Sequence, residues 1–96
     1  MALVFEWDES KAAANRRKHG VTFDEAASVF GDERAVIFPD VEHSDEELRL
    51  LIVGHSHYQR LLFVSHVECG PEVVRLIGAR QATRRERRDY ERGTTR

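Results

Sequence analysis

The sequence has one cysteine and no long apolar run, and these absences exclude several classes of protein. A single cysteine cannot form a disulfide within the chain, which favours a reducing compartment and a cytoplasmic location. Apolar runs such as residues 50–53 are far too short to cross a membrane, and residues 1–7 carry no basic leader. The 96 residues leave room for one small domain, expected at residues 1–93 with a frayed tail at 94–96.

Lysine is scarce, and it is absent from the C-terminal part of the chain. Residues 75–96 carry eight arginines and three acidic residues, whereas residues 1–74 carry seven basic and fourteen acidic residues. The planar guanidinium group of arginine pairs with two phosphate oxygens at once and stacks on bases, which the lysine ammonium group cannot do. The arginine block therefore predicts a phosphate-bearing ligand such as RNA, with a solvated helix face as the alternative.

The N-terminal part of the chain predicts a strand followed by two helices. A short strand is expected at residues 4–7. Small polar residues at positions 8–10 open a first helix, and Gly20 ends it by adopting a left-handed conformation. Thr22 and Glu25 form a capping box at the start of a second helix. These two helices are expected to form an N-terminal helix hairpin.

The rest of the chain predicts a series of strands and a final helix. The expected strands cover residues 34–38, 48–56, 60–68 and 72–79. Short loops between the last three strands imply an antiparallel meander, and hence an antiparallel sheet of four to five strands. A second capping box, Thr83 with Glu86, opens the final helix at about Arg84. The order β-α-α-β-β-β-β-α is an α+β layout with helices packed on the sheet.

Several polar residues are expected to share one face of this sheet. Arg60, His66 and Glu68 differ by even numbers, so their side chains point to the same side of their strand. A tight turn around residues 69–71 would place His66 opposite Arg75, and cross-strand partners share a face. We therefore expect Arg75 to join His66 and Glu68, provided that the register does not slip by one residue.

The final helix is expected to carry a stripe of arginines. Arg84, Arg87 and Arg88 are spaced at i, i+3 and i+4, so they lie on one side of a helix. Tyr90 lies on a neighbouring side, and Arg80 ends the strand just before the helix. The stripe should therefore lie beside the polar end of the sheet.

Two groups of residues resemble the signatures of the BrnT family of toxins. The N-terminal group comprises Glu6-Trp7-Asp8, Asn15, Lys18-His19-Gly20-Val21, Phe23 and Glu25-Ala26. The C-terminal group comprises His66, Glu68, Arg75, Ala79-Arg80, Ala82-Thr83-Arg84, Glu86-Arg87 and Tyr90-Glu91. The resemblance spans nearly the whole chain, with both groups in the expected order.

This resemblance implies a fold, an activity and a partner. BrnT proteins are the toxin halves of type II toxin–antitoxin pairs and have a RelE-like fold. The chain would then cleave RNA and inhibit translation. Its partner would be a BrnA-like antitoxin with a ribbon-helix-helix domain, and operator DNA would be contacted only through that antitoxin. Two toxins with two antitoxins would form the complex.

The predicted cluster contains the chemical groups that RNA cleavage without a metal ion requires. The 2′-hydroxyl must lose a proton, the leaving 5′-oxygen must gain one, and the charge on the phosphate must be stabilised. We assign His66 or Glu68 as the base, Arg75 and Arg80 to the phosphate, and Tyr90 to positioning the substrate or donating a proton. The alternative is that His66, Glu68 and Arg75 form a structural hydrogen-bonded set. The expected RNA contacts are Lys18, Arg60, Arg84, Arg87 and Arg88.

The remaining histidines and acidic residues are expected to be structural or solvated. His55, His57 and Cys69 do not match the spacing of common zinc sites. The acidic segment at residues 40–47 could suggest magnesium, but crowded acids on a polar loop are usually only solvated. His19 is expected to cap the end of the first helix. No metal or cofactor is therefore expected.

Two functions from other classes compete with the ribonuclease interpretation. In one, the chain is a non-catalytic nucleic-acid-binding or regulatory module whose arginine helix only holds phosphates. In the other, the arginines bind an acidic protein partner, which is compatible with a toxin whose antitoxin covers the basic site. An assay with RNA distinguishes the ribonuclease from the non-catalytic binding module. The ribonuclease cleaves the RNA, whereas the binding module shows salt-sensitive binding without cleavage.

Overall fold

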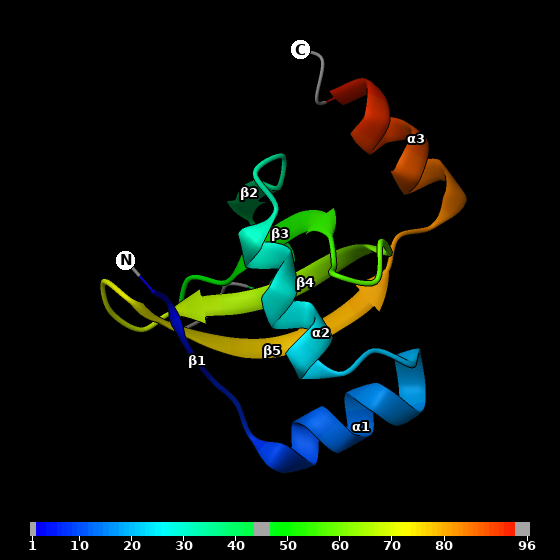
Figure 1. The fold of residues 1–96 in the computed structure, drawn as a ribbon. Coiled ribbons are helices and arrows are strands. Elements are labelled where there is room, and N and C mark those ends of the chain that lie inside the picture. The colour runs from blue at the N-terminus through cyan, green and yellow to red at the C-terminus, as the bar shows by residue number, and fades with distance from the viewer. Residues whose placement is uncertain (1, 44–46, 94–96) are drawn as a thin grey trace.

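A computed structural model describes residues 2–43 and 47–93 of the chain, and its elements follow the expected order (Figure 1). Residues 94–96, expected to fray, lie outside the described residues, as do residues 44–46 of the acidic segment. The strands are β1 Val4–Glu6, β2 Val36–Pro39, β3 Leu50–His55, β4 Leu61–Glu68 and β5 Val73–Gln81. The helices are α1 Glu9–His19, α2 Phe23–Ser28 and α3 Arg84–Gly93, with short 3-10 helices η1 Val29–Gly31 and η2 Val41–His43.

The five strands form one mixed sheet in the order β1-β5-β4-β3-β2. Strands β2 to β5 are an antiparallel meander, which the short loops between the last three strands had predicted for β3, β4 and β5. Strand β1 joins the edge of β5 in the parallel direction, with Val4 opposite Val73. Nothing in the local sequence of β1 indicates this pairing, because its partner lies almost seventy residues further along the chain.

The predicted end of the first helix and the predicted start of the second are confirmed, with one difference in the capping. Gly20 closes α1 in the left-handed conformation, with φ of 69°. The hydroxyl of Thr22 accepts a hydrogen bond from the backbone N–H of Glu25 at 3.1 Å. The Glu25 carboxylate is buried and binds Arg60 and Ser56. The first capping box therefore has the hydrogen bond to the Thr22 hydroxyl, whereas the Glu25 carboxylate is used elsewhere.

The second capping box is complete and fixes the start of α3. The Thr83 hydroxyl accepts from the backbone N–H of Glu86 at 3.1 Å, and the Glu86 carboxylate accepts from that of Thr83 at 2.9 Å. Both hydrogen bonds of the predicted capping box are thus present, and α3 begins at Arg84 as expected.

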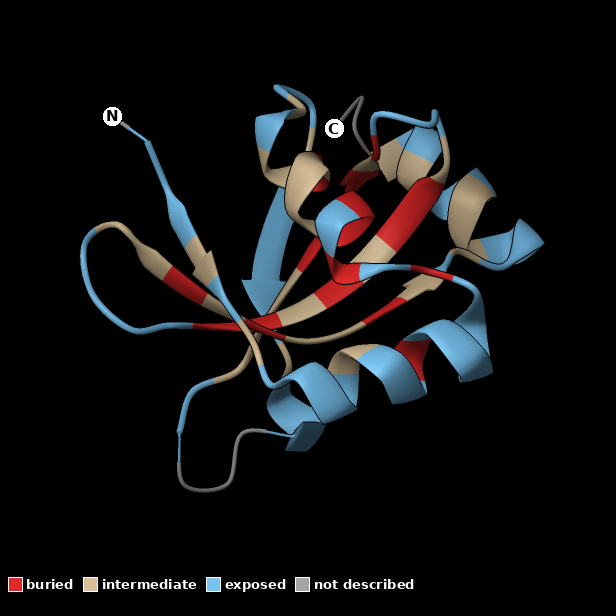
Figure 2. Cartoon of the chain, turned by 60° about the horizontal axis from the view of Figure 1, so that its bottom comes forward, coloured by how far each residue is buried: buried red, intermediate tan, exposed pale blue. Residues whose placement is uncertain are grey.

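One face of the sheet, here called the core face, is covered by α2 (Figures 1 and 2). Phe23 and Ala26 of α2 pack with Leu62 and Val64 of β4 in the centre of this layer. The buried apolar cluster consists of Val21, Phe23, Ala26, Val29, Ile52, Leu62, Val64, Val74, Leu76 and Ala79. Burial of these side chains is the main force that holds α2 on the sheet. No helix in the described part of the chain is long and apolar enough to span a membrane.

Helix α1 lies beside β5 and is attached to it through Asn15, its one buried residue. The Asn15 amide donates to the Ala79 carbonyl at 2.9 Å and accepts from the Ala79 N–H at 3.0 Å. It also donates to the Val21 carbonyl at 3.0 Å. Since β1 pairs with β5 only as far as Arg75, Asn15 satisfies backbone groups on the next part of that edge. This attachment brings the end of α1 close to the end of β5.

The register between β4 and β5 differs from the expected one. Val67 lies opposite Arg75, and His66 lies opposite Leu76. The predicted pairing of His66 with Arg75 is therefore wrong, because the turn between the strands is longer by one residue. A shift of one residue moves a side chain to the other face of the sheet. Arg75 consequently lies on the face opposite to His66.

Candidate functional site

The face of the sheet opposite α2, here called the open face, carries a cleft of about 560 Å³. Its floor is formed by side chains of the central strands, including Leu51, Phe63 and Ser65. The end of α1 and the segment around η2 form its walls. The charged, histidine and amide residues that line it are Asn15, Lys18, His19, Asp40, His43, Arg49 and Arg80.

Three cations reach this cleft from three separate segments. Lys18 lies in the last turn of α1, Arg49 directly precedes β3, and Arg80 lies near the end of β5. Asp40 is the acidic residue of the lining. A cleft with three cations and one carboxylate suits an anionic ligand, because opposite charges attract most strongly where water is partly excluded.

Arg80 is held in a fixed position by the start of α3. Its guanidinium donates to the two carboxylate oxygens of Glu86 at 2.8 and 3.0 Å, and it lies 4.7 Å from the centre of the Phe63 ring. The hydrogen bond from Arg80 lowers the pKa of Glu86 to about 2, and the same bond raises the pKa of Arg80. The ion pair is therefore fully charged at neutral pH, and Arg80 enters the cleft as a positioned cation.

His43 and Asp40 supply a group in the cleft that can transfer a proton. The Nδ1 atom of His43 lies 3.0 and 3.2 Å from the two Asp40 carboxylate oxygens. The His43 side chain is 62% exposed, whereas that of Asp40 is only 12% exposed. An ionised carboxylate can only accept, so Nδ1 carries the proton and Nε2 is left with a free lone pair when the ring is neutral. The pair thus presents a basic nitrogen to solvent.

His19 contributes a second imidazole to the cleft, from the end of α1. It was expected to cap that helix. The capping bond instead comes from the backbone N–H of Gly20, which donates to the Arg16 carbonyl at 2.9 Å.

His66, predicted as a base, is fully buried on the core face. Its ring makes an edge contact with Phe30, with ring centres 4.9 Å apart, and its Nε2 atom is buried with no hydrogen-bond partner among the described residues. Burial lowers the pKa of His66, because the charged ring would lose its hydration. The even-numbered side chains of β4 share a face as predicted, but that face is the one packed against α2.

Arg60 was predicted to contact RNA, and the structure places it in an ion pair with Glu25. The Glu25 carboxylate, which is 2% exposed, accepts two hydrogen bonds from this guanidinium and one from the Ser56 hydroxyl. Arg60 also donates to the Gly20 carbonyl at 3.1 Å. The hydrogen bond from Arg60 lowers the pKa of Glu25. These contacts join α2 to the turn between β3 and β4.

Glu68 and Arg75 lie near the start of β5, whereas Arg80 lies near its end. Glu68 is exposed at the end of β4. It is the cross-strand partner of Val74, so both side chains lie on the core face. Arg75 lies on the open face and donates to both Glu47 carboxylate oxygens at 2.9 Å. Arg75 and Arg80 are five positions apart along this strand, which corresponds to about 16 Å. The structure therefore does not bring the predicted cluster of His66, Glu68 and Arg75 together.

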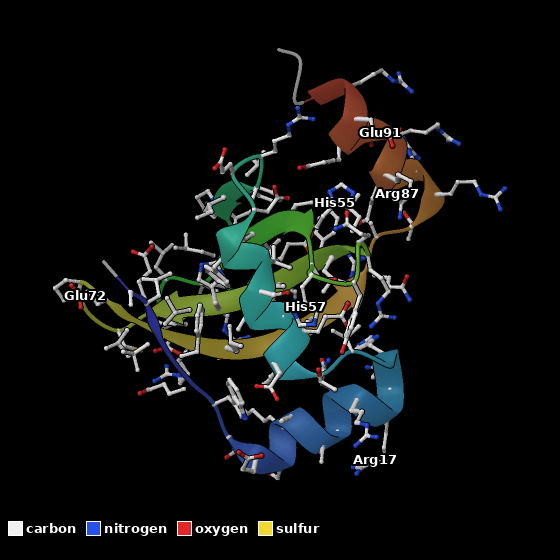
Figure 3. All side chains as sticks on the ribbon, viewed as in Figure 1. Arg17, His55, His57, Glu72, Arg87 and Glu91 are labelled. Atoms are coloured by element: carbon white, nitrogen blue, oxygen red, sulfur yellow. The ribbon has the colours of Figure 1, made fainter. Side chains whose placement is uncertain are left out.

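The arginines of α3 extend the positive charge beyond Arg80. Arg84 and Arg88 are exposed, and Arg87 is half-buried. Figure 3 shows Arg87 on α3, at the opposite end of the sheet from Glu72 in the turn between β4 and β5. The Tyr90 hydroxyl donates to the Arg34 carbonyl at 3.0 Å, so it anchors α3 to the segment before β2.

Sequence reasoning missed the residues that complete the cleft. Asp40 and His43 were treated as members of a solvated acidic segment, and Arg49 was not considered. The spacing of Asp40 and His43 by three residues, just after a strand, is the one local signal that could have found the pair. Among the described residues, no three His, Cys, Asp or Glu side chains are grouped closely enough to hold a metal ion.

Comparison with known proteins gives a match to a family model and a match to a solved structure. A family model described as "Ribonuclease toxin, BrnT, of type II toxin-antitoxin system" matches residues 7–86. The crystal structure of the Brucella abortus ribonuclease toxin BrnT superposes with a TM-score of 0.65 at 26% identity, covering 88% of this chain and 99% of that chain. No curated protein sequence matches. Since the family model covers most of the chain, including the greater part of both predicted signatures, the protein belongs to the BrnT family of ribonuclease toxins of type II toxin–antitoxin systems.

Proposed function

We propose that the chain cleaves RNA without a metal ion in the cleft on the open face. The observation that carries this proposal is the meeting of Lys18, Arg49 and Arg80 with the Asp40–His43 pair in one cleft. The cations suit a phosphate, and the imidazole is held by a carboxylate with its second nitrogen free to accept a proton.

The chemistry follows from these positions. Nε2 of His43 removes the proton of the ribose 2′-hydroxyl, and the 2′-oxygen attacks the adjacent phosphorus. Lys18 and Arg80 stabilise the extra negative charge on the phosphate oxygens. The bond from phosphorus to the 5′-oxygen then breaks, and protonated His19 gives its proton to that oxygen. The products are a 2′,3′-cyclic phosphate and a 5′-hydroxyl end.

This assignment keeps part of the site expected from sequence and revises the rest. Arg80 remains at the phosphate, and Lys18, which was expected only to contact the RNA, joins it there. The arginines of the final helix, Arg84, Arg87 and Arg88, bind the flanking RNA backbone. Tyr90 holds α3 in place, and the basic role passes from His66 or Glu68 to His43. Arg75 and Arg60 serve as structural ion-pair partners.

The biological setting follows from family membership. A type II toxin has an antitoxin, and we propose that this one is a BrnA-like protein with a ribbon-helix-helix domain. Two toxins and two antitoxins would form the complex, which contacts operator DNA through the antitoxin alone. Free toxin would inhibit translation in the cytoplasm by cleaving mRNA.

Replacing His43 tests this function directly. Purified His43→Ala should cleave RNA about 100-fold or more slowly than the unmodified protein, because a general base typically contributes at least this factor. His57→Ala is the matched control, since His57 is an exposed histidine outside the cleft. Cleavage by the unmodified protein should persist with excess chelator.

Three outcomes would contradict the proposal. Cleavage by His43→Ala at the unmodified rate would remove His43 from the reaction. Loss of activity with chelator would show that a metal ion is needed. Salt-sensitive RNA binding by the unmodified protein without any cleavage would favour a non-catalytic binding module.

A further inference from the structure

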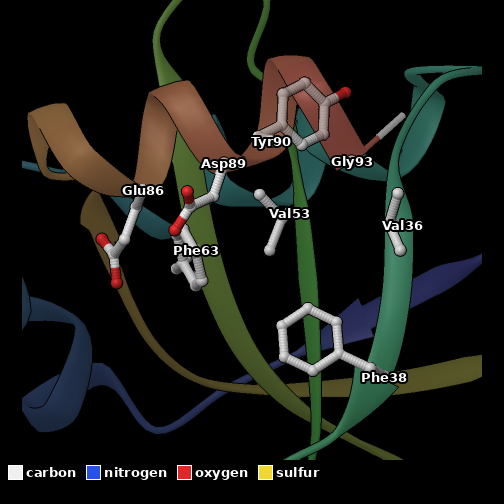
Figure 4. Close-up of a pocket in the computed structure, with 8 residues that line it drawn as sticks. All are labelled: Val36, Phe38, Val53, Phe63, Glu86, Asp89, Tyr90 and Gly93. Atoms are coloured by element: carbon white, nitrogen blue, oxygen red, sulfur yellow. The ribbon is translucent and has the colours of Figure 1, made fainter. Parts of the chain in front are cut away.

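Another hollow, an apolar pocket between α3 and the sheet, is here called the helix pocket (Figure 4). It has a volume of about 300 Å³ and contains three aromatic side chains, Phe38, Phe63 and Tyr90. Two carboxylates of α3, those of Glu86 and Asp89, complete its polar lining. On the basis of the proposed ribonuclease function, we propose that the helix pocket binds a guanine base of the RNA that occupies the cleft.

The helix pocket and the cleft share a wall. Phe63 lines both hollows, and the Arg80 guanidinium lies over its ring at 4.7 Å from the ring centre. A nucleotide whose phosphate binds Arg80 would therefore have its base beside the helix pocket. Unpaired bases of RNA are commonly bound by stacking on aromatic side chains, as Phe38 and Phe63 would allow.

The two carboxylates in the helix pocket differ in their availability. Both oxygens of Glu86 accept hydrogen bonds from Arg80, and one also accepts from the backbone of Thr83. Asp89 makes no hydrogen bond or ion pair within residues 2–43 and 47–93. Figure 4 shows its carboxylate turned toward Phe63. Asp89 is therefore the acceptor that is free to bind a ligand.

A free carboxylate beside an aromatic surface distinguishes guanine from the other bases. An ionised carboxylate accepts hydrogen bonds through two oxygens and donates none. Guanine presents two neighbouring donors on its pairing edge, the N1–H and the 2-amino group. Adenine and cytosine each place an acceptor beside a single donor there, and uracil places its donor between two acceptors. Asp89 would repel those acceptors, so it should favour guanine.

A segment of a partner protein is the competing occupant of this apolar pocket. Three features favour the base: continuity with the cleft through Phe63, a carboxylate without a partner, and the neighbouring arginines of α3 that suit an RNA backbone. An antitoxin segment would need only the apolar walls.

Binding of uncleavable RNA tests the proposal separately from catalysis. Short 2′-O-methyl oligonucleotides, which cannot undergo attack by the 2′-oxygen, would carry guanine, inosine, adenine, cytosine or uracil at one position. The unmodified protein should bind the guanine oligonucleotide about tenfold more tightly than the adenine one, the usual discrimination of a paired contact to a base edge. Inosine, which lacks the 2-amino group, should bind at an intermediate strength.

The matched variants are Asp89→Asn and Asp24→Asn. Asp24 is an exposed acid of α2 outside both hollows, so its change should leave the guanine preference intact. Asp89→Asn should abolish that preference while leaving the fold unchanged, because Asp89 is exposed. Equal binding of all bases by the unmodified protein, or retention of the preference by Asp89→Asn, would overturn the proposal.

Two further readouts separate the remaining explanations. If Asp89→Asn keeps the guanine preference but weakens the toxin–antitoxin complex, the helix pocket holds a protein segment and the proposal is overturned. If the unmodified protein shows the guanine preference but no cleavage of ordinary RNA, the proposed ribonuclease function fails and the guanine site stands.

Discussion

His43 and His66 are the same kind of side chain, and their surroundings give them opposite properties. His43 is 62% exposed and is held at Nδ1 by the Asp40 carboxylate. His66 is fully buried against Phe30, and its Nε2 atom has no partner among the described residues. Exposure with a carboxylate partner allows proton exchange, whereas burial keeps the ring neutral. Residue type alone therefore does not tell which histidine could act as a base.

The buried His66 should make the stability of the protein depend on pH. Its pKa in the folded protein lies below the ordinary value of 6.5, so the unfolded chain takes up a proton first as the pH falls. The free energy of unfolding should therefore decrease as the pH falls below about 6.5 and through the lower pKa of the folded state. Denaturant unfolding at pH 7.5 and at pH 5.5 measures this loss.

The variant His66→Leu isolates this effect from that of the other histidines. Leucine does not titrate, and it removes a buried nitrogen without a hydrogen bond, so the variant should be at least as stable at low pH. An equal loss of stability between the two pH values in both proteins would show that His66 is not responsible.

At the scale of elements, the cleft depends on how α1 and α3 are attached to β5. Asn15 joins α1 to the edge of β5 and so places Lys18 in the cleft. Glu86, in the first turn of α3, binds Arg80 and also completes the helix cap. Each attachment is a polar contact between a helix and the same strand, so the positions of Lys18 and Arg80 are set by β5.

Asn15→Ala should therefore affect both stability and activity. The change leaves three buried backbone groups without their partner, which should lower the free energy of unfolding by about 2–4 kcal/mol. It should also slow RNA cleavage under conditions where the variant is folded, because Lys18 is no longer held near Arg80. Urea unfolding and a cleavage assay would measure the two effects.

Arg17→Ala is the matched control on the same helix. Arg17 is exposed on α1 and is not part of the cleft lining (Figure 3). If Arg17→Ala destabilised the protein as much as Asn15→Ala, the attachment of α1 through Asn15 would not be the cause.

At the scale of the whole molecule, charge is distributed unevenly along the chain. The acidic excess of residues 1–74 and the basic excess of residues 75–96 give a net charge of only −2. The basic residues gather at the end of β5 and along α3, while Lys18 and Arg49 add to them from elsewhere in the sequence. A local basic surface on a nearly neutral protein can bind RNA without a general affinity for polyanions.

Expression of this chain alone should arrest bacterial growth, and co-expression of its antitoxin should relieve the arrest. The reason is that free toxin would cleave RNA, whereas a bound antitoxin would cover or inactivate the cleft. His43→Ala should permit growth, and His57→Ala should arrest it as the unmodified chain does. Growth curves together with protein levels on a gel would measure this. Normal growth with abundant unmodified chain would contradict a toxin function.

The sequence by itself determined the local features of this protein. The caps at Gly20, Thr22 and Thr83 and the meander of β3 to β5 depend on residues close together in the chain. Local hydrogen bonds and short loops fix such features with little influence from the rest of the molecule. The arginine-rich C-terminal end is likewise visible in the sequence, because its arginines are close together in the chain.

Only the tertiary structure decided which residues meet. One extra residue in the turn before β5 moved Arg75 to the other face from His66, and the packing of α2 buried His66. Lys18, His43, Arg49 and Arg80 share a cleft because α1, η2, β3 and β5 come together in the fold. A strand pattern specifies two faces, but burial of the α2 layer decides which face is left open to a ligand.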